Sequence, residues 1–112
     1  MSGRASVLWL LAAVMLLAAC QEQKQAAPGP GRGDPNLGRQ VFLAQCSVCH
    51  GSDPTQRGPM GPPIKGASRE LLEARILHGS YPPGYTPKQQ TSVMQPIPQA
   101  ASNIDDLAAY LR

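Results

Sequence analysis

Residues 46–50 read Cys46-Ser47-Val48-Cys49-His50, and this pentapeptide decides the fold. Two thiols two residues apart, followed directly by an imidazole, form the pattern by which c-type haem is attached to a protein. The spacing lets each thiol add to one of two adjacent vinyl groups of the porphyrin, and it places Nε2 of His50 beneath the iron. Because histidine is the commonest proximal ligand of haem iron, the motif predicts Cys46 and Cys49 as covalent attachment sites and His50 as an axial ligand.

Three other uses of paired cysteines compete with haem attachment. A thioredoxin-type redox pair needs a βαβ context, and no run of buried strands is found near Cys46. A disulfide between Cys46 and Cys49 would close too small a loop to stabilise the fold much. A zinc site could use Cys46, Cys49, His50 and His78 as its four ligands. Adjacent Cys49 and His50 would point apart, however, and a second ligand pair at finger-like spacing is missing. Covalent haem is therefore the favoured interpretation.

The N-terminal segment has the pattern of an export signal. Arg4 is its only charged residue, and residues 7–17 form an unbroken apolar run, which is shorter than the ~20 residues that span a bilayer. The segment ends Leu17-Ala18-Ala19-Cys20, which resembles the lipobox of bacterial lipoproteins, where the chain is cut before a lipid-bearing cysteine. Haem takes two of the three cysteines, so we expect residues 1–19 to be removed and Cys20 to be lipidated. An ordinary cleavage site followed by a chance cysteine is the alternative.

Two parts follow the cleavage site. Residues 21–33 lack apolar periodicity and end in alternating proline and glycine, so they cannot bury enough apolar surface to offset the entropy of ordering. Together with Cys20 they form a predicted lipidated, flexible tether over residues 20–33. Residues 34–112 suffice for one small domain. The sequence thus predicts an exported lipoprotein on the periplasmic side of a bacterial membrane.

The predicted domain is poor in large apolar side chains. Beyond residue 33 it has one phenylalanine, three tyrosines and no tryptophan. A small domain with so thin an apolar inventory needs a further stabilising group, and a haem ring can act as the core that irregular loops enclose. No stretch alternates apolar and polar residues with period two, so we expect no sheet.

Helix signals occur in three places. Asp34 can cap a first helix that has Pro35 at its first position and leads into Cys46. Ser68 and Gly79 are suited to bound the second helix, and Ser102 or Asn103 can cap the third, whose Asp105 and Asp106 would lie at the positive end of the helix dipole. The second and third predicted helices run from Arg69 to His78 and from Ile104 to Leu111.

Residues 37–112 resemble a small class I c-type cytochrome in several features that occur in the same order. Gly38-Arg39-Gln40-Val41-Phe42 resembles the first helix of that family, where a glycine and an aromatic residue let the last helix cross closely, here with Tyr110. Gly61-Pro62-Pro63-Ile64 resembles the loop whose proline carbonyl accepts a hydrogen bond from the iron-ligating histidine. Met94-Gln95-Pro96 resembles the stretch that brings a methionine sulfur to the other face of the haem. Residues 80–93, before Met94, are a longer segment than compact members have.

The resemblance implies an all-α, cytochrome c-like fold with three main helices and long loops wrapped around one covalent haem c. It gives Pro62 the carbonyl that supports His50, with Pro59 as the rival, and it makes Met94 the second axial ligand. Met60 and His78 are the other candidates for that position. Met60 belongs to the loop expected on the histidine side, and His78 ends a helix, where an imidazole is usually a surface group.

The charge balance does not indicate nucleic-acid binding. The chain has a formal net charge of +3, but beyond residue 33 it has seven basic and six acidic residues, and two haem propionates would make the domain slightly negative. No basic block of five or more residues occurs. We interpret Arg69, Arg75 and Lys88 as solvated surface residues. No pattern of a hydrolytic or group-transfer site is present, so we do not expect an enzyme.

These observations predict a membrane-tethered monohaem protein that passes single electrons between exported redox partners and binds no small-molecule substrate. The alternative is the haem subunit of a larger oxidoreductase, for example one that oxidises sulfur compounds or alcohols. The sixth ligand of the iron, and whether the protein purifies alone, separate the two hypotheses.

Overall fold

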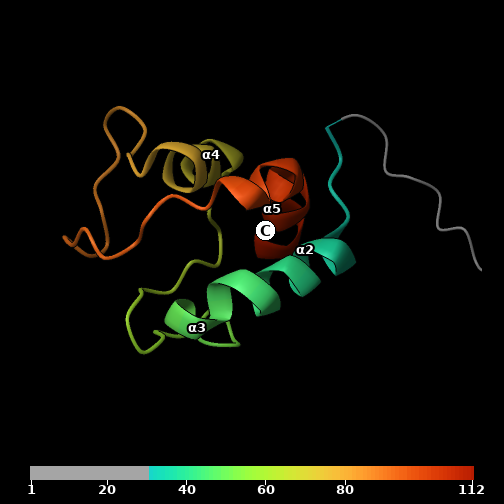
Figure 1. Ribbon diagram of the computed structural model, residues 1–112, viewed down its shortest axis with the longest axis horizontal. Helices are drawn as coiled ribbons and strands as arrows, with labels where there is room; N and C mark the ends of the chain where they lie inside the picture. The colour runs from blue at the N-terminus through green and yellow to red at the C-terminus, as the bar shows by residue number, and fades with distance from the viewer. Residues whose placement is uncertain (1–30) are drawn as a thin grey trace, which may run out of the picture.

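The computed structural model describes residues 31–112, and every regular element in this range is helical (Figure 1). The elements are α2 (Pro35–Val41), a π-helical segment (Phe42–Cys46), α3 (Ser47–His50), α4 (Arg69–His78), a 3₁₀ segment (Pro98–Asn103) and α5 (Ile104–Leu111). The predicted all-α fold with three main helices and long loops is confirmed. The predicted signal segment, Cys20 and most of the tether lie outside the described residues. No helix within residues 31–112 is long and apolar enough to cross a membrane.

The first helix begins where its capping residue predicts. The Asp34 side chain accepts a hydrogen bond from the Asn36 N–H, and Pro35 occupies the first helical position. The helix does not continue as a regular α-helix into the haem motif, because its backbone widens into a π-helix from Phe42 to Cys46. Because a π-helix has more residues per turn than an α-helix, the side chains that follow it point in other directions around the helix axis than they would in a continued α-helix. The π-helix therefore sets the direction in which Cys46 and the short helix α3 present their side chains.

Helices α4 and α5 have the predicted bounds. The Ser68 hydroxyl accepts from the Leu71 N–H, and Gly79 ends α4 in the left-handed conformation, with φ of 63°. The capping of α5 differs from the prediction, since a 3₁₀ segment leads into the helix and Asn103 makes no side-chain cap. The Asn103 amide instead donates to a carboxylate one turn later, that of Asp106.

Asp106 does more than complement the dipole of α5. Its side chain is buried, and its second carboxylate oxygen accepts a hydrogen bond from the Asp34 N–H at 2.8 Å. This contact spans 72 residues of sequence and fixes the start of α2 to the start of α5. The neighbouring Asp105 pairs with Arg69 of α4 at 2.7 Å, so the two adjacent carboxylates join α5 to different helices.

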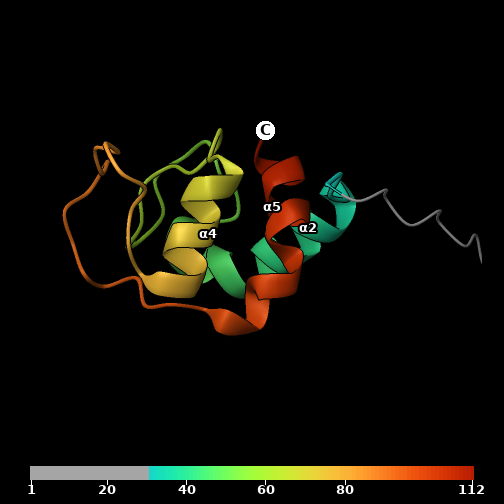
Figure 2. The same ribbon diagram turned by 90° about the horizontal axis from the view of Figure 1, so that it is seen from above.

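The first and last helices cross closely at Gly38 (Figure 2). A Cβ atom at this position would lie 2.0 Å from the backbone oxygen of Asp106, which means that only glycine permits the crossing. One turn further on, the rings of Phe42 and Tyr110 pack with their centroids 5.5 Å apart. The close approach expected from the glycine, the aromatic residue and Tyr110 is thus present in the structure.

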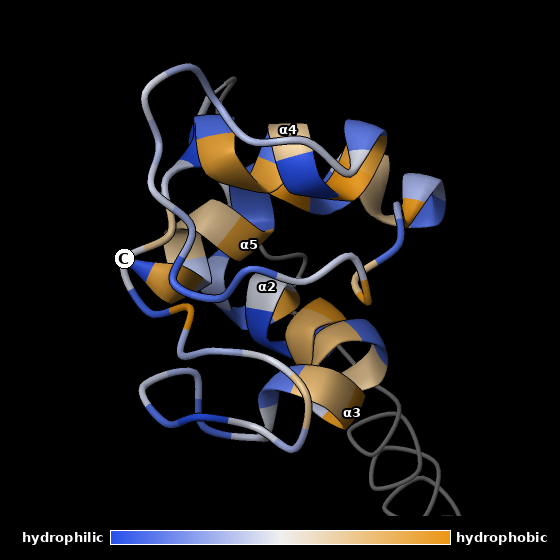
Figure 3. Ribbon diagram, turned by 90° about the vertical axis from the view of Figure 1, so that its left-hand side faces the viewer, coloured by the Kyte–Doolittle hydropathy of each residue, from blue (hydrophilic) through white to orange (hydrophobic). Residues whose placement is uncertain are grey.

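The hydrophobic core is small and lies between the π-helical segment, α4, the 3₁₀ segment and α5, where apolar helix faces turn inward (Figure 3). Within residues 31–112 it consists of seven buried apolar side chains, namely Phe42, Leu72, Ile76, Ala100, Ile104, Leu107 and Leu111. Five of the seven also line a large cavity, so the core is open on one side. This opening positions the candidate site.

Candidate haem site

A cavity of about 540 Å³ lies against the core. Its walls come from α3, from the loop over residues 60–68, from α4, from residues 81–97 and from α5. Most of the side chains that line it are apolar, including Leu72, Ile76, Leu107 and Leu111. A cavity of this size and character is suited to a largely apolar ligand of cofactor size.

The pentapeptide over residues 46–50 contributes three side chains to this cavity. Cys46, Cys49 and His50 all line it, and both thiols are free and half-buried. Positions i, i+3 and i+4 lie close together on a helix, which explains why all three side chains reach the cavity, although adjacent Cys49 and His50 were expected to point apart. Burial, reinforced by the neighbouring Cys49, raises the pKa of the Cys46 thiol to about 11. The pocket thus disfavours a thiolate at this position, whereas a thioether carries no charge and fits there.

His50 is held in one orientation by the backbone beside it. The imidazole is only 8% exposed, and its Nδ1 lies 2.9 Å from the carbonyl oxygen of Pro62. A carbonyl oxygen only accepts hydrogen bonds, so Nδ1 carries the proton and Nε2 keeps its lone pair for a metal. Gly61 makes room for the ring, because a Cβ at this residue would lie 2.5 Å from Nδ1. The family resemblance gave this supporting role to Pro62, with Pro59 as the rival, and it is the Pro62 carbonyl that lies 2.9 Å from Nδ1.

The three candidates for the second axial position lie in different surroundings. Met94 is half-buried and lines the cavity, on a segment that follows α4. Met60 also lines the cavity but is 49% exposed, and its sulfur lies 4.0 Å from the sulfur of Cys49. His78 is exposed and borders a separate surface depression beside Glu70 and Glu73. Figures 1 and 3 place α3 and α4 on opposite sides of the molecule. His50 belongs to α3, whereas Met94 is attached to α4 through the hydrogen bond from Arg75 to its carbonyl oxygen.

The polar groups of the cavity fit a ligand with a negatively charged edge. Among the described residues, Arg75 and Lys88 are the cations that line the cavity, and no carboxylate does. The amide oxygens of Gln45 and Gln89 are buried beside the cavity without a hydrogen-bond partner among the described residues. A buried acceptor that is left unpaired costs about 1–3 kcal/mol, so these two groups indicate that a further polar group belongs in this space. A haem ring fits the cationic lining, because its propionates could pair with Arg75 and Lys88, whereas the two amide oxygens need a hydrogen-bond donor, which an ionised propionate does not provide.

Arg75 corrects one interpretation from the sequence. It is half-buried rather than a solvated surface residue, and its guanidinium donates to the carbonyl oxygens of Gly79 and Met94. Arg69 does lie on the surface, paired with Glu73 and Asp105. Nothing in the sequence around Arg75 distinguishes it from Arg69, because its partners are backbone carbonyls that every residue possesses.

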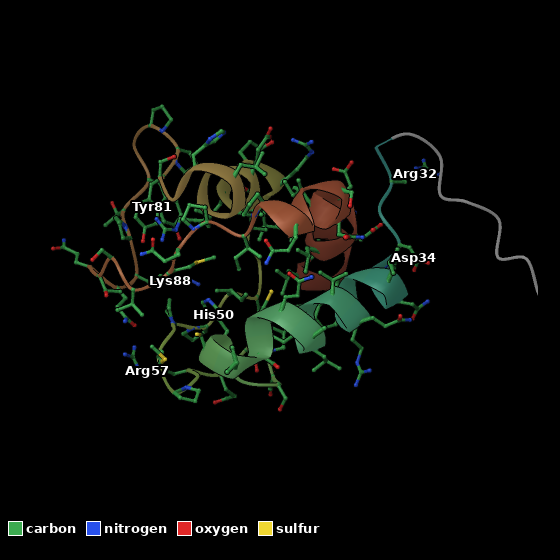
Figure 4. The ribbon with its side chains drawn as sticks, in the orientation of Figure 1. Arg32, Asp34, His50, Arg57, Tyr81 and Lys88 are labelled. Carbon is green, nitrogen blue, oxygen red and sulfur yellow. The ribbon has the colours of Figure 1, made fainter. Side chains whose placement is uncertain are left out.

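The long segment over residues 80–93 runs along the cavity (Figure 4). The Lys88 ammonium donates to the Pro63 carbonyl at 2.9 Å, and the Gln89 amide donates to the Met60 carbonyl at 3.0 Å. Both acceptors belong to the loop that supports His50. The segment therefore joins the histidine side of the cavity to α4, and Lys88, although exposed, has a defined partner.

The competing zinc interpretation finds no support within residues 31–112. No group of three or more histidine, cysteine or acidic side chains in this range is arranged to hold a metal ion. His78 borders the surface depression, whereas the two cysteines and His50 line the cavity. The donor set in the cavity is instead two thiols, one imidazole and the thioethers of Met60 and Met94, which suits a c-type haem.

Helices that close on an apolar cavity, with a Cys-x-x-Cys-His motif in its wall, define a c-type cytochrome. The chain belongs to the cytochrome c family, whose model matches residues 35–112. It is 34% identical over 80 residues to the cytochrome c-553-like protein of Synechocystis sp.. This match covers 71% of the chain and 66% of the relative, so the chain spans just under two thirds of that protein. No solved structure matches the chain. Membership of this family means that the protein carries one covalently attached haem c.

Proposed function

We propose that the protein is a monohaem electron carrier, tethered to a membrane through a lipid on Cys20, that passes single electrons between exported redox partners. Its haem would supply a reversible one-electron change at iron, so that one electron enters or leaves and no atom is transferred. No small-molecule substrate takes part. Family membership supports the electron-transfer role, and the lipobox-like sequence before Cys20 supports the tether.

Each candidate residue has a defined role in this proposal. Cys46 and Cys49 form the two thioether bonds, and His50 binds the iron through Nε2. The Pro62 carbonyl fixes the plane of the imidazole and makes it more electron-rich through the Nδ1–H bond of 2.9 Å. Met94 supplies the sulfur of the second axial bond.

A carrier requires that both axial positions of the iron are filled by the protein. The observation that carries the proposal is that the His50 imidazole, held by the Pro62 carbonyl, and the half-buried Met94 thioether line the same cavity, the first from α3 and the second from the segment that is hydrogen-bonded to α4. A histidine–methionine pair raises the reduction potential. It also leaves no open position for a substrate, which favours outer-sphere electron transfer over catalysis at the metal.

Replacement of Met94 by alanine tests this function, with Met60→Ala as the matched control. The purified wild-type holoprotein should be red, be reduced and reoxidised reversibly, and show the weak red absorption of ferric iron with a thioether ligand. Met94→Ala should lose that band, lower the potential and bind imidazole and carbon monoxide. Met60→Ala should retain all three wild-type properties.

Two results would contradict the carrier. If Met60→Ala or His78→Ala abolishes the band and Met94→Ala does not, the axial assignment is wrong. If wild type binds carbon monoxide readily, or is isolated only with a larger partner subunit, the protein is instead the haem subunit of an oxidoreductase.

A further inference from the structure

The segment that carries Met94 is attached to α4 at three points. The Arg75 guanidinium donates to the Met94 carbonyl at 3.2 Å, and the Ile97 N–H donates to the Ile76 carbonyl at 2.7 Å. The ring of Pro96 lies against Gly79, where an added Cβ would be 3.3 Å from the proline Cγ. The last two contacts hold the chain after Met94, whereas the contact of Arg75 is made to Met94 itself.

The chain on the other side of Met94 has only local support within the described residues. Val93 is exposed, and its N–H donates to the Thr91 hydroxyl two residues earlier. The next hydrogen bond to a distant part of the fold is that of Gln89, five residues before Met94. Without Arg75, the stretch from residue 90 to residue 96, most of which lines the cavity, would therefore have no hydrogen bond to a helix within the described residues.

The guanidinium of Arg75 is itself held from two directions. Its Nη1 donates to the carbonyl oxygen of Gly79, the residue that ends α4, at 2.5 Å. Its central carbon lies 4.4 Å from the centroid of the Tyr81 ring, and the Tyr81 ring stacks on that of Tyr85, with centroids 5.5 Å apart. A planar guanidinium can donate in two fixed directions while one face lies on an aromatic ring. A lysine ammonium cannot reproduce this combination.

We propose that Arg75 is a positioning residue for the distal ligand, in that it fixes the Met94 backbone to the end of α4 and so keeps the thioether sulfur on the iron. This inference rests on the proposed role of Met94. In the ferric protein the iron–thioether bond competes with external ligands. A fixed backbone limits how often the sulfur leaves, so Arg75 controls how readily an external ligand enters.

The charge of Arg75 offers a rival explanation, because a cation in the cavity wall could act on the haem directly. Arg75→Lys separates the two roles, since lysine keeps the charge but loses the planar fork and the stacking on Tyr81. Arg69→Lys is the matched control, because Arg69 belongs to the same helix and contacts Glu73 and Asp105 rather than the Met94 segment.

The experiment measures imidazole binding to the ferric holoprotein, together with the red thioether band and the denaturant midpoint. Arg75→Lys should bind imidazole about tenfold more tightly than wild type, because a hydrogen bond made by a charged group contributes about that factor. Its red band should also disappear at a lower imidazole concentration. Arg69→Lys should bind imidazole as wild type does. Tyr81→Leu should also bind imidazole more tightly than wild type does. Tyr81→Phe, which keeps the ring, should bind imidazole as wild type does.

The outcomes separate this inference from the function on which it rests. If Met94→Ala leaves the wild-type red band intact, Met94 is not the ligand and both proposals fail. If Met94→Ala abolishes the band but Arg75→Lys binds imidazole like Arg69→Lys, the positioning role alone is overturned. The positioning role is also overturned if imidazole affinity rises in proportion to the fall in the denaturant midpoint in every variant, Arg69→Lys included. That result would mean that general stability, and not the position of Met94, controls imidazole binding. Should Arg75→Lys not fold, Tyr81→Leu, which keeps the charge of Arg75 but removes the ring on which its guanidinium lies, serves as the second variant with the same expected direction.

Discussion

At the scale of single residues, the proposed iron ligand depends on backbone atoms that have no side-chain signature. The Nδ1 proton of His50 is directed by the Pro62 carbonyl, and the space for its ring exists because Gly61 has no Cβ. A change at either neighbour can therefore act on the iron without touching it. This makes Gly61 a test of the proposed support of His50.

Gly61→Ala should raise the reduction potential and destabilise the holoprotein. The added Cβ would lie 2.5 Å from Nδ1 and 2.6 Å from Cε1 of His50, so the ring or the loop must shift and the bond to Pro62 must weaken. A less electron-rich imidazole stabilises ferric iron less, and overpacking of this kind costs about 1–3 kcal/mol. Redox titration and denaturant unfolding measure the two effects.

Gly84→Ala is the control for Gly61→Ala. Gly84 has φ of 77° and no atom within 4 Å of an added Cβ, so alanine there strains the backbone without a steric contact. It should lower stability by about 1–2 kcal/mol and leave the potential unchanged. An unchanged potential in Gly61→Ala would contradict the proposed support of His50 by this loop.

Some residue roles follow from the sequence and others do not. Cys46, Cys49 and His50 are found by their spacing, because attachment to a rigid ring fixes the distance between the groups. Arg75 and Gln89 could not be found in this way. Their partners are carbonyl oxygens of Met94, Gly79 and Met60, and only the path of the chain decides which carbonyl lies within reach.

At the scale of elements, the helices with strong end signals were the predictable ones. Ser68 and Gly79 bound α4 through a side-chain cap and a left-handed glycine, and both act locally. The π-helix that ends at Cys46 and the 3₁₀ segment that precedes α5 had no side-chain cap or terminal glycine by which to predict them. The long segment over residues 80–93 was not predictable either, since its attachments lie far apart in the sequence.

The segment over residues 80–93 should open more readily when its hydrogen bond to the histidine-side loop is removed. Gln89→Ala deletes the bond to the Met60 carbonyl, which is worth about 1 kcal/mol, or roughly fivefold in the population of the open segment. Cleavage of the native holoprotein by chymotrypsin after Tyr85 should accelerate by that factor. The global unfolding free energy should change little.

Gln90→Ala provides the matched comparison, because Gln90 is exposed and its side chain makes no hydrogen bond within residues 31–112. This variant should be cleaved at the wild-type rate. Equal cleavage of the Gln89 and Gln90 variants would mean that the amide of Gln89 does not hold the segment.

At the scale of the whole molecule, the chain enters the domain away from the cavity. Figure 4 places Arg32 and Asp34 at one end and Tyr81, Lys88 and His50 toward the other. The hydrogen bond from the Asp34 N–H to Asp106 fixes this entry point on α5. A membrane attachment that precedes residue 31 would therefore leave the cavity side free to meet a partner.

Cys20→Ser should convert the protein into a water-soluble red domain. The haem motif is untouched, and the predicted lipid is the only anchor that the sequence analysis proposes. Fractionation of cells into soluble and membrane parts, with a high-salt wash, measures the change. The wild type should remain with the membrane after the wash, since a lipid anchor is not displaced by salt. A Cys20→Ser protein that still sediments with membranes would place the anchor elsewhere.

Haem attachment should be required for the domain to fold. Five of the seven buried apolar side chains line a cavity of about 540 Å³, so without a ring in place most of the core has no packing partner. Cavities cost about 24 cal/mol per Å³, which here amounts to on the order of 10 kcal/mol, as much as the whole stability of a small domain. The double variant Cys46→Ala, Cys49→Ala, exported from cells that make c-type haem, should thus give little folded protein and no cooperative thermal transition by circular dichroism. Val48→Ala is the control, because Val48 lies between the two cysteines but is 76% exposed, and it should give a red, folded protein. A colourless double variant that unfolds cooperatively would show instead that the helices pack without the haem.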